Sequence, residues 1–145
     1  MGTLTKRFEL DAGHRLSKHD FDCQNLHGHR YQFEVYVDGE VDSSTGMIVD
    51  FAHVKEPVME AFDHNFILNK DDPILSIREE IEVQQEKELY LIEGEPTAEN
   101  IAEETLDLIL QSLTKGEEQR INQIRVELFE TPNSSVTVKR RLRDE

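Results

Sequence analysis

The sequence predicts an α+β domain in which an antiparallel sheet carries helices on one face. Two observations predict it: stretches of alternating apolar and polar residues near both ends of the chain, and a long amphipathic segment between them. A period of two is typical of half-buried strands, whereas apolar residues three and four apart are typical of helices. The 145 residues can form one sizeable core, and no linker or repeat divides them, so we assign 1–145 to a single domain.

The first two strands are expected near the N-terminus. Residues 4–12 alternate, with Lys6 interrupting the apolar positions, and residues 31–37 alternate without interruption. Antiparallel pairing of these two strands is the simplest connection, and it leaves residues 15–26 as an unusually long loop. Long ordered loops in compact domains are often functional.

Two helices are expected after these strands. VKEPVMEAF (54–62) is predicted to be helical, with Pro57 tolerated only near the start of the helix. PTAENIAEETLDLILQSL (96–113) has the clearest helical periodicity, and Thr97 is a natural N-cap in front of an acidic first turn. Gly116 is expected to end this second helix.

The remaining segments are expected to be strands and loops. A short strand or extended segment is predicted at 47–51, and a strand at 87–92. The polar residues 70–88 predict a loop. Two closing strands, 121–131 and 135–141, are predicted to be joined by a Pro-Asn-Ser turn.

Composition narrows the possible partners. The chain has 16 Lys and Arg against 31 Asp and Glu, which gives a formal net charge of −15. Such a surface repels nucleic acid and anionic membranes. The N-terminus lacks the apolar stretch of a signal peptide, and no apolar run approaches the roughly 18 residues of a membrane span. We therefore expect no nucleic-acid or membrane partner, and a cytoplasmic location. The single cysteine excludes an internal disulfide framework.

Three histidines are predicted to gather on one face of the sheet. His27 and His29 are two residues apart and so point to the same side of a strand, with Gly28 permitting a bend or a close neighbour. His14 lies on the equivalent face of the first strand. Three imidazoles with an open coordination position are typical of catalytic zinc. The alternative is that these are separate polar residues, each with its own hydrogen-bond partners.

The only cysteine, Cys23, lies in the long loop that leads to these histidines. As a fourth ligand it would close a zinc site, whereas as a base or nucleophile it would remain free. A nearby cation or imidazolium lowers the pKa of a thiol and makes the thiolate accessible. An inert buried thiol is the alternative, and the polar setting DFDCQN argues against it.

The other histidines differ in their neighbours. Asp63 directly precedes His64, and a carboxylate can orient an imidazole and raise its basicity for proton transfer, although adjacent Asp-His is common by chance. His19 and His53 lack a partner at diagnostic spacing, so we expect them to be surface or loop residues.

A further carboxylate continues an apolar strand face. Glu130 shares its parity with Ile124, Val126 and Leu128. A buried carboxylate is costly unless it meets a hydrogen-bonding partner, such as the N–H and amino edge of a heterocycle. The alternative is a strand end that already lies in solvent.

With these motifs the chain resembles the 6-pyruvoyl-tetrahydropterin synthase family. The motifs follow the order of the family over most of the chain: FELDAGHRL (8–16), CQNLHGHRY (23–31), GMIVDF (46–51), FDHNFILN (62–69), PTAENIA (96–102) and VELFET (126–131). Three residues separate Cys23 from His27, which resembles the 6-carboxy-5,6,7,8-tetrahydropterin synthase (QueD) type. The 6-pyruvoyl type typically has a longer interval, and a third type carries a glutamate near this position. Residues 70–95 depart from the family pattern.

The resemblance implies a fold, an assembly and residue roles. The implied fold is the tunnelling fold, a four-stranded antiparallel sheet with two helices on one side, which forms barrel-shaped trimers and then a homo-hexamer with active sites between subunits. The implied roles are zinc ligands for His14, His27 and His29; the catalytic thiol for Cys23; the partner proton-transfer pair for Asp63 and His64; the pterin anchor for Glu130; and the border of the pterin pocket for Thr97 and Glu99.

The resemblance also implies a reaction. The expected activity is zinc-dependent conversion of 7,8-dihydroneopterin triphosphate to 6-carboxy-5,6,7,8-tetrahydropterin, acetaldehyde and triphosphate, on the way to 7-deazaguanines such as queuosine. A 6-pyruvoyl-tetrahydropterin synthase, a non-catalytic metal-binding or sensor module, and a different zinc hydrolase remain alternatives. The cations that could meet the triphosphate are Lys6, Arg7, Arg15, Lys18 and the basic cluster at 139–143, although a solvated terminal face is the favoured interpretation of that cluster.

Overall fold

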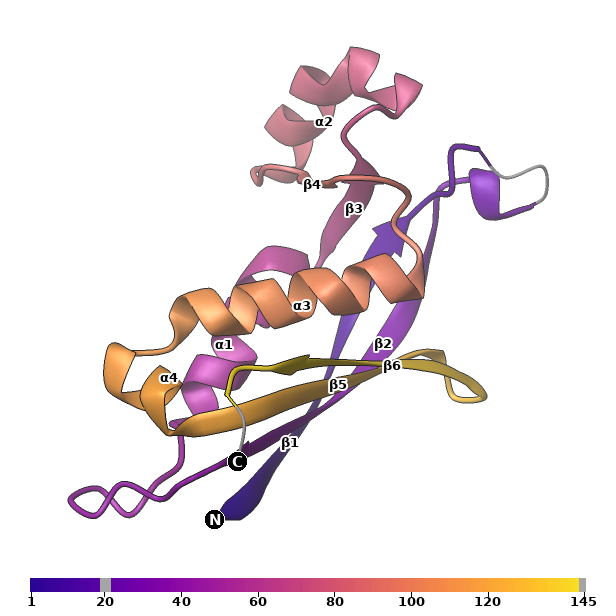
Figure 1. Ribbon diagram of the computed structural model, residues 1–145. Coiled ribbons are helices and arrows are strands. Elements are labelled where there is room, and N and C mark those ends of the chain that lie inside the picture. The colour runs from indigo at the N-terminus through magenta and orange to yellow at the C-terminus, as the bar shows by residue number, and fades with distance from the viewer. Residues whose placement is uncertain (19–21, 144–145) are drawn as a thin grey trace.

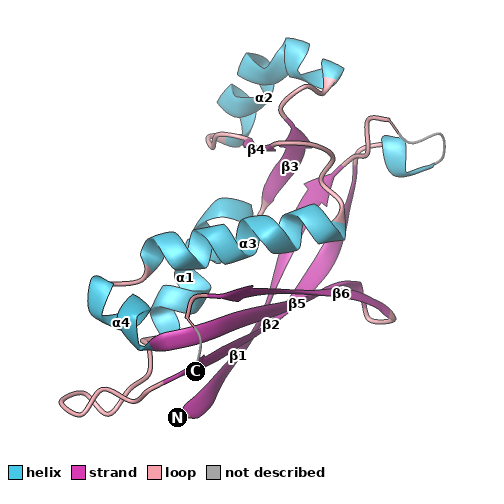
Figure 2. Ribbon diagram, viewed as in Figure 1, coloured by secondary structure: helices cyan, strands magenta, loops and turns pink. Residues whose placement is uncertain are grey.

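The computed structural model describes residues 1–18 and 22–143, which form one sheet with helices packed against it (Figure 1). The six strands lie in the order β4-β3-β1-β2-β5-β6. Their bounds are β1 Gly2–His14, β2 His27–Gly39, β3 Asn65–Asn69, β4 Tyr90–Ile92, β5 Ile121–Thr131 and β6 Ser134–Arg141. The helices are α1 Phe51–Phe62, α2 Arg78–Gln85, α3 Ala98–Ser112 and α4 Lys115–Arg120, with 3-10 turns η1 Asp22–Gln24 and η2 Pro73–Ile77 (Figure 2).

Strands β1, β2, β5 and β6 form the antiparallel part of the sheet. Phe8 pairs with Phe33, and their rings stack 5.0 Å apart inside the core. Lys6 shares the inward parity of β1, and its ammonium group lies 5.7 Å from the centre of the Phe51 ring, so its charge remains at the edge of the core. The predicted pairing of the first two strands is confirmed.

The sheet has six strands, so the expected four-stranded antiparallel sheet is only part of it. Strand β3 pairs with β1 in parallel, and β4 pairs with β3 in parallel. Parallel neighbours need a crossover connection, and the segment that contains α2 provides one between β3 and β4. The domain is therefore α+β with a mixed sheet.

Helices α1 and α3 pack against each other and against one face of the sheet (Figure 1). The Thr97 hydroxyl accepts a backbone N–H from the first turn of α3, so the predicted N-cap is confirmed. The predicted end at Gly116 is wrong. Helix α3 ends at Ser112, and a new helix begins at once because Thr114 and Glu117 form a reciprocal capping box around α4, which contains Gly116.

Helix α1 begins earlier than predicted, directly after its N-cap Asp50. Residues 47–50 form no strand and serve as an extended entry. Pro57 consequently lies in the helix interior, where it has no N–H to donate to the His53 carbonyl. The Ser112 hydroxyl of α3 donates to that carbonyl instead, so the buried acceptor is satisfied from the neighbouring helix.

The loop predicted at 70–88 is wrong, because this segment folds as η2 and α2. Asp72 caps η2 by accepting the Ile74 N–H at 2.9 Å. Helix α2 buries no residue and lies beyond the end of the sheet, so it lacks the apolar stripe by which helices are recognised (Figure 1). None of the described helices has the length and apolar character needed to cross a membrane. The cytoplasmic location stays a prediction.

Candidate metal centre

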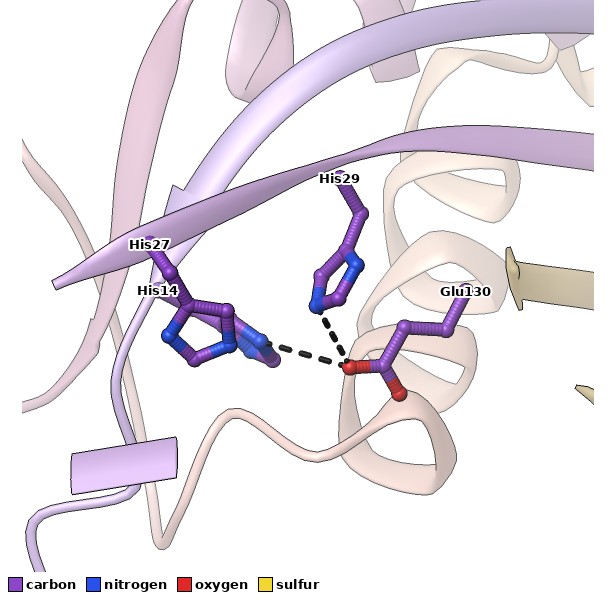
Figure 3. A group of neighbouring side chains, drawn as sticks. All are labelled: His14, His27, His29 and Glu130. Atoms are coloured by element: carbon purple, nitrogen blue, oxygen red, sulfur yellow. Dashed lines mark ion pairs between the residues drawn. The ribbon is translucent and has the colours of Figure 1, made fainter. Parts of the chain in front are cut away.

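The three predicted histidines meet where β1 ends and β2 begins. His14 pairs in register with His27, and His29 pairs with Ala12 on the same face. The ring centres are 4.6 Å apart for His14 and His27, 5.2 Å for His14 and His29, and 5.1 Å for His27 and His29 (Figure 3). A Cβ on Gly28 would lie 3.0 Å from the Ala12 carbonyl, so glycine permits the close strand approach. The predicted convergence is confirmed.

Two backbone carbonyls orient the rings. His14 Nδ1 lies 2.7 Å from the Pro96 carbonyl, and His27 Nδ1 lies 2.7 Å from the Asn25 carbonyl. A carbonyl can only accept, so in each ring Nδ1 carries the hydrogen and Nε2 of the neutral form keeps its lone pair. Contacts of this kind set the tautomer of histidines that bind metals. The sequence analysis missed both carbonyls, since any residue type can supply one.

Glu130 completes the cluster from β5. Its Oε1 lies 2.9 Å from His29 Nε2 and 3.4 Å from His14 Nε2, as the dashed lines show (Figure 3). The four possible ligand atoms of His14, His27, His29 and Glu130 lie within 4.8 Å of one another. The role of Glu130 as a pterin anchor stays a prediction; in the structure its carboxylate faces the imidazoles.

The cluster leaves electron pairs facing one another. His14 Nε2 and His29 Nε2 are buried and make no hydrogen bond within the described part of the chain. Contact with His14 lowers the pKa of the Glu130 carboxyl, against the effect of burial. Burial lowers the pKa of His29, although the charge of Glu130 opposes this. A carboxyl with a lowered pKa therefore faces the His29 imidazole, whose pKa is also lowered.

A metal ion fits this donor set. Acceptors that face each other at such distances repel unless a proton or a metal ion lies between them. Nitrogen and oxygen ligands about 2.0–2.1 Å from a tetrahedral zinc ion lie about 3.3 Å from one another, comparable to the separations between Glu130 and the two imidazoles. His14, His27, His29 and Glu130 form a group that could hold one ion.

A buried phenol borders the cluster. The Tyr31 hydroxyl lies 3.3 Å from His14 Nδ1, and its ring packs edge-on against His14 and His29. Burial, followed by the charge of Glu130, raises the pKa of Tyr31, so this group stays neutral at physiological pH. Tyr31 therefore adds an apolar wall and no charge to the site.

Cys23 lies in η1, in the loop between β1 and β2, and is partly exposed. Its carbonyl accepts the Leu16 N–H at 2.8 Å, which joins the two arms of the loop beside the thiol. The polar setting of Cys23 is thus confirmed, whereas its catalytic role stays a prediction. His19 lies outside the described residues.

Asp63 and His64 form a pair on the connection from α1 to β3. His64 Nδ1 lies 3.0 Å from Asp63 Oδ1, and the His64 backbone has a left-handed φ of 55°. The His64 N–H donates to the Asp11 carbonyl at 2.7 Å, and Asp63 Oδ1 accepts the Asp11 N–H at 3.3 Å. These contacts fix the pair beside β1.

The pair lies at the same end of the sheet as the imidazoles. His64 lines a cavity of about 450 Å³ with Asp11 and Arg30, and His27 and His29 also line it. In the strands, Asp11 and Arg30 alternate with Ala12 and His29, so their side chains point away from the face that carries the three imidazoles. The structure therefore pairs Asp63 with His64, and within the described residues no hydrogen bond or ion pair joins this pair to the imidazoles.

The remaining predicted site residues lie at the start of α3. Thr97 follows Pro96, whose carbonyl holds His14, and its hydroxyl caps the helix. Glu99 is exposed in the first turn. His53, which was expected to be a surface or loop residue, lies partly exposed in helix α1, and its Nδ1 lies 2.8 Å from Glu117 Oε1.

Several cations proposed for the triphosphate are already paired. Arg7 contacts Glu34 at 3.0 Å, and Arg15 contacts Asp72 at 2.7 Å. In the basic cluster at 139–143, Arg140 contacts Asp107 and Glu103, which leaves that guanidinium committed to α3.

The fold and site define an α+β domain with a histidine-rich candidate metal centre at one end of its sheet. The chain belongs to the 6-pyruvoyl tetrahydropterin synthase family, a family of enzymes whose model matches residues 3–141. It is 40% identical to the 6-carboxy-5,6,7,8-tetrahydropterin synthase of Rickettsia bellii over 138 residues, which cover 92% of this chain and 97% of the relative. It is 30% identical to the protein of the same name from Aquifex aeolicus, with 94% and 96% covered.

Solved structures agree on the fold. The 6-pyruvoyl tetrahydropterin synthase of Plasmodium vivax aligns with a TM-score of 0.68 at 18% identity, covering 97% of this chain and 99% of that one. The corresponding protein of Caenorhabditis elegans aligns with a TM-score of 0.61 at 24% identity, covering 95% and 94%. At these identities the similarity shows the fold alone.

Proposed function

We propose that this chain is a zinc-dependent lyase that converts 7,8-dihydroneopterin triphosphate to 6-carboxy-5,6,7,8-tetrahydropterin, acetaldehyde and triphosphate. The observation that carries the proposal is that the side chains of His14, His27 and His29 meet at one point. Backbone carbonyls set the tautomers of His14 and His27, so that each Nε2 is free to bind a metal ion. The names of the relatives supply the substrate class. The pathway toward 7-deazaguanines such as queuosine is part of the same proposal.

The chain supplies ligands and proton carriers. Zinc held by His14, His27 and His29 would act as a Lewis acid that lowers the pKa of the substrate side-chain hydroxyls. Cys23, as a thiolate, and His64, oriented by Asp63, move protons on and off the side-chain carbons. The oxidation of the side chain and the reduction of the ring occur within one molecule, so no external redox cofactor is needed.

We propose that the pterin ring binds beside this centre. Glu130 accepts hydrogen bonds from the N–H and amino edge of the ring, and its carboxylate turns away from the imidazoles to do so. Thr97 and Glu99 border the pocket from the start of α3. The proposal draws support from the position of Glu130, whose side chain is about 30% exposed and already lies at the centre.

A complete site needs a second copy of the chain under this proposal. Within the described residues of one chain no hydrogen bond or ion pair joins the Asp63–His64 pair to the imidazoles, and the pair contacts Asp11, whose side chain points away from them, so we propose that the pair serves the centre of a neighbouring subunit. We propose a homo-hexamer, a dimer of trimers, with barrel-forming sheets. Mass measurement of the native assembly tests this, and a monomer with full turnover would contradict it.

The decisive assay incubates the zinc-loaded protein with 7,8-dihydroneopterin triphosphate and identifies products by mass. Acetaldehyde together with 6-carboxytetrahydropterin supports the proposal, whereas triphosphate release without acetaldehyde indicates a 6-pyruvoyl-type reaction. Zinc binding without turnover indicates a non-catalytic module.

The Cys23→Ala variant tests the thiol. It should keep one zinc per subunit and lose turnover by roughly 100-fold or more, the range expected when a positioned acid or base is removed. Full activity in this variant would remove Cys23 from the mechanism and favour a hydrolase that relies on the histidines alone.

A further inference from the structure

The loop that carries Cys23 is fixed to the body of the domain by a buried carboxylate. Arg15, the first residue after β1, donates from Nε to Asp72 Oδ2 at 2.8 Å and from one terminal nitrogen to Asp72 Oδ1 at 2.7 Å. The Asp72 side chain is fully buried. Such a fork-to-fork contact holds a guanidinium in one orientation.

The same guanidinium reaches the other arm of the loop. Its second terminal nitrogen donates to the Gln24 carbonyl at 3.3 Å, directly after Cys23. The Leu16 N–H donates to the Cys23 carbonyl at 2.8 Å. The two successive carbonyls at the thiol are therefore held by Arg15 and Leu16, and Arg15 is itself fixed by Asp72.

Asp72 is held firmly enough to fix Arg15. Its carboxylate also accepts the Ile74 N–H at 2.9 Å, and its N–H donates to the Asn69 carbonyl at the end of β3. Burial works to raise the pKa of Asp72, but the Arg15 and Ile74 donors outweigh it, and the net shift of the pKa is downward. Asp72 thus stays charged at neutral pH.

A second carboxylate holds the loop on the side of the histidines. Glu95 accepts from the Ser17 hydroxyl at 3.0 Å and from the Lys18 N–H at 2.7 Å. The next residue, Pro96, accepts from His14. The loop and a metal-binding imidazole are therefore fixed to the same short segment, which limits how far the thiol can move relative to the candidate metal centre.

We propose that Arg15 and Asp72 act as positioning residues that hold Cys23 in place for proton transfer. The proposal rests on the proposed catalytic role of Cys23 and adds two residues that touch no reacting atom. It also takes Arg15 out of the set of triphosphate cations, because all three of its side-chain nitrogens already donate to Asp72 or Gln24.

The test compares Arg15→Gln and Asp72→Asn with Lys70→Gln in the full, zinc-loaded protein. Lys70 lies two residues before Asp72 and makes an exposed contact with Glu93 at 2.7 Å, so it is a matched control. We expect Arg15→Gln and Asp72→Asn to lower kcat by about 10- to 100-fold, the cost of a misplaced catalytic group. KM and zinc content should stay within about twofold in every variant, because none of these residues is proposed to touch substrate or metal.

The two substitutions should act as a unit. The double variant is expected to lose no more kcat than either single variant, because both break one contact. Arg15→Lys keeps the charge without the fork and should lie between Arg15→Gln and the unmodified protein. It provides a folded variant if Arg15→Gln melts at the assay temperature.

Alkylation by iodoacetamide tests whether the Arg15–Asp72 contact holds Cys23 in place, and it needs no turnover. Cys23 is the only thiol, and releasing its loop should raise the alkylation rate at least about fivefold in Arg15→Gln but not in Lys70→Gln. An unchanged alkylation rate and kcat would overturn the proposal, as would a raised KM with normal kcat, which indicates a phosphate-binding Arg15. If alkylation changes as expected but the unmodified protein makes no product, the proposed function fails, whereas the inference that Arg15 and Asp72 position Cys23 is supported.

Discussion

Two histidine–glutamate contacts in this molecule have nearly the same length and opposite surroundings. His53 Nδ1 lies 2.8 Å from Glu117 Oε1, and His29 Nε2 lies 2.9 Å from Glu130 Oε1. The first contact joins helices α1 and α4, and the second lies at the end of the sheet. Distance alone does not separate a structural pair from a set of metal ligands.

Their neighbours do separate them. Glu117 is buried and also accepts the Thr114 N–H and the Asp50 N–H, each at 2.9 Å, so donors surround the carboxylate. At Glu130 the neighbours are imidazoles, and the Nε2 atoms of His14 and His29 have no hydrogen bond within the described residues. A carboxylate surrounded by N–H groups has its acceptors satisfied, whereas one that faces imidazole lone pairs is satisfied only by a proton or a metal ion.

The largest expected effect is the loss of metal. His14→Ala should weaken zinc binding on the order of 100- to 1,000-fold, since it removes one of the three proposed histidine ligands that share a binding free energy of roughly 10–16 kcal/mol. The measurement is competition with a chromophoric chelator. His53→Ala is the matched control and should bind zinc as the unmodified protein does. Equal losses in both variants would erase the distinction between the two contacts.

A smaller effect is expected on stability at the structural pair. Glu117→Gln should cost about 1–3 kcal/mol in the free energy of unfolding, because the amide accepts from fewer of the donors. Glu118→Gln is the control, since Glu118 is the exposed neighbour in α4. Urea titration of both variants measures the difference, and similar losses would mean that the Glu117 network adds nothing beyond helix charge.

The pH dependence of the free energy of unfolding gives a second test of the Glu117 network. Burial acts to raise the pKa of Glu117, but the N–H groups of Thr114, Asp50 and His53 outweigh it and lower the pKa below the ordinary value of 4.5. A lowered folded-state pKa gives stability that is present above the unfolded-state pKa and is lost as the pH falls through the folded-state pKa. Acid titration of unfolding should therefore show a smaller loss in Glu117→Gln than in the unmodified protein.

The sequence predicted the meeting of the three histidines well because a strand has a fixed period. Once β1 and β2 pair, the register of His14 with His27 follows, and His29 lies on the same face. Thr97 was equally predictable, since N-caps have a side-chain signature. The positions of these residues depend on local rules that the sequence carries.

Other features depend on contacts that no local pattern encodes. Helix α2 lacks an apolar stripe, and β3 and β4 become strands only because the chain returns to the open edge of β1. The partner of His53 lies 64 residues away on another helix. The parity of Glu130 predicted a carboxylate on an apolar face, but parity cannot show that two imidazoles lie within reach of the same oxygen.

The smallest expected effect is on the free energy of unfolding at Glu130, and its sign is opposite to that expected at Glu117. In metal-free protein, Glu130→Gln should leave the free energy of unfolding unchanged or raise it by up to about 1 kcal/mol, because an amide N–H can donate to an imidazole lone pair that a carboxylate repels. The same change at Glu117 destabilises, so paired urea titrations in chelator compare the two sites directly. A loss at Glu130 as large as that at Glu117 would mean that protonated imidazoles already donate to this carboxylate. The cluster would then be stable without an ion, and the case for a metal there would depend on measured zinc affinity alone.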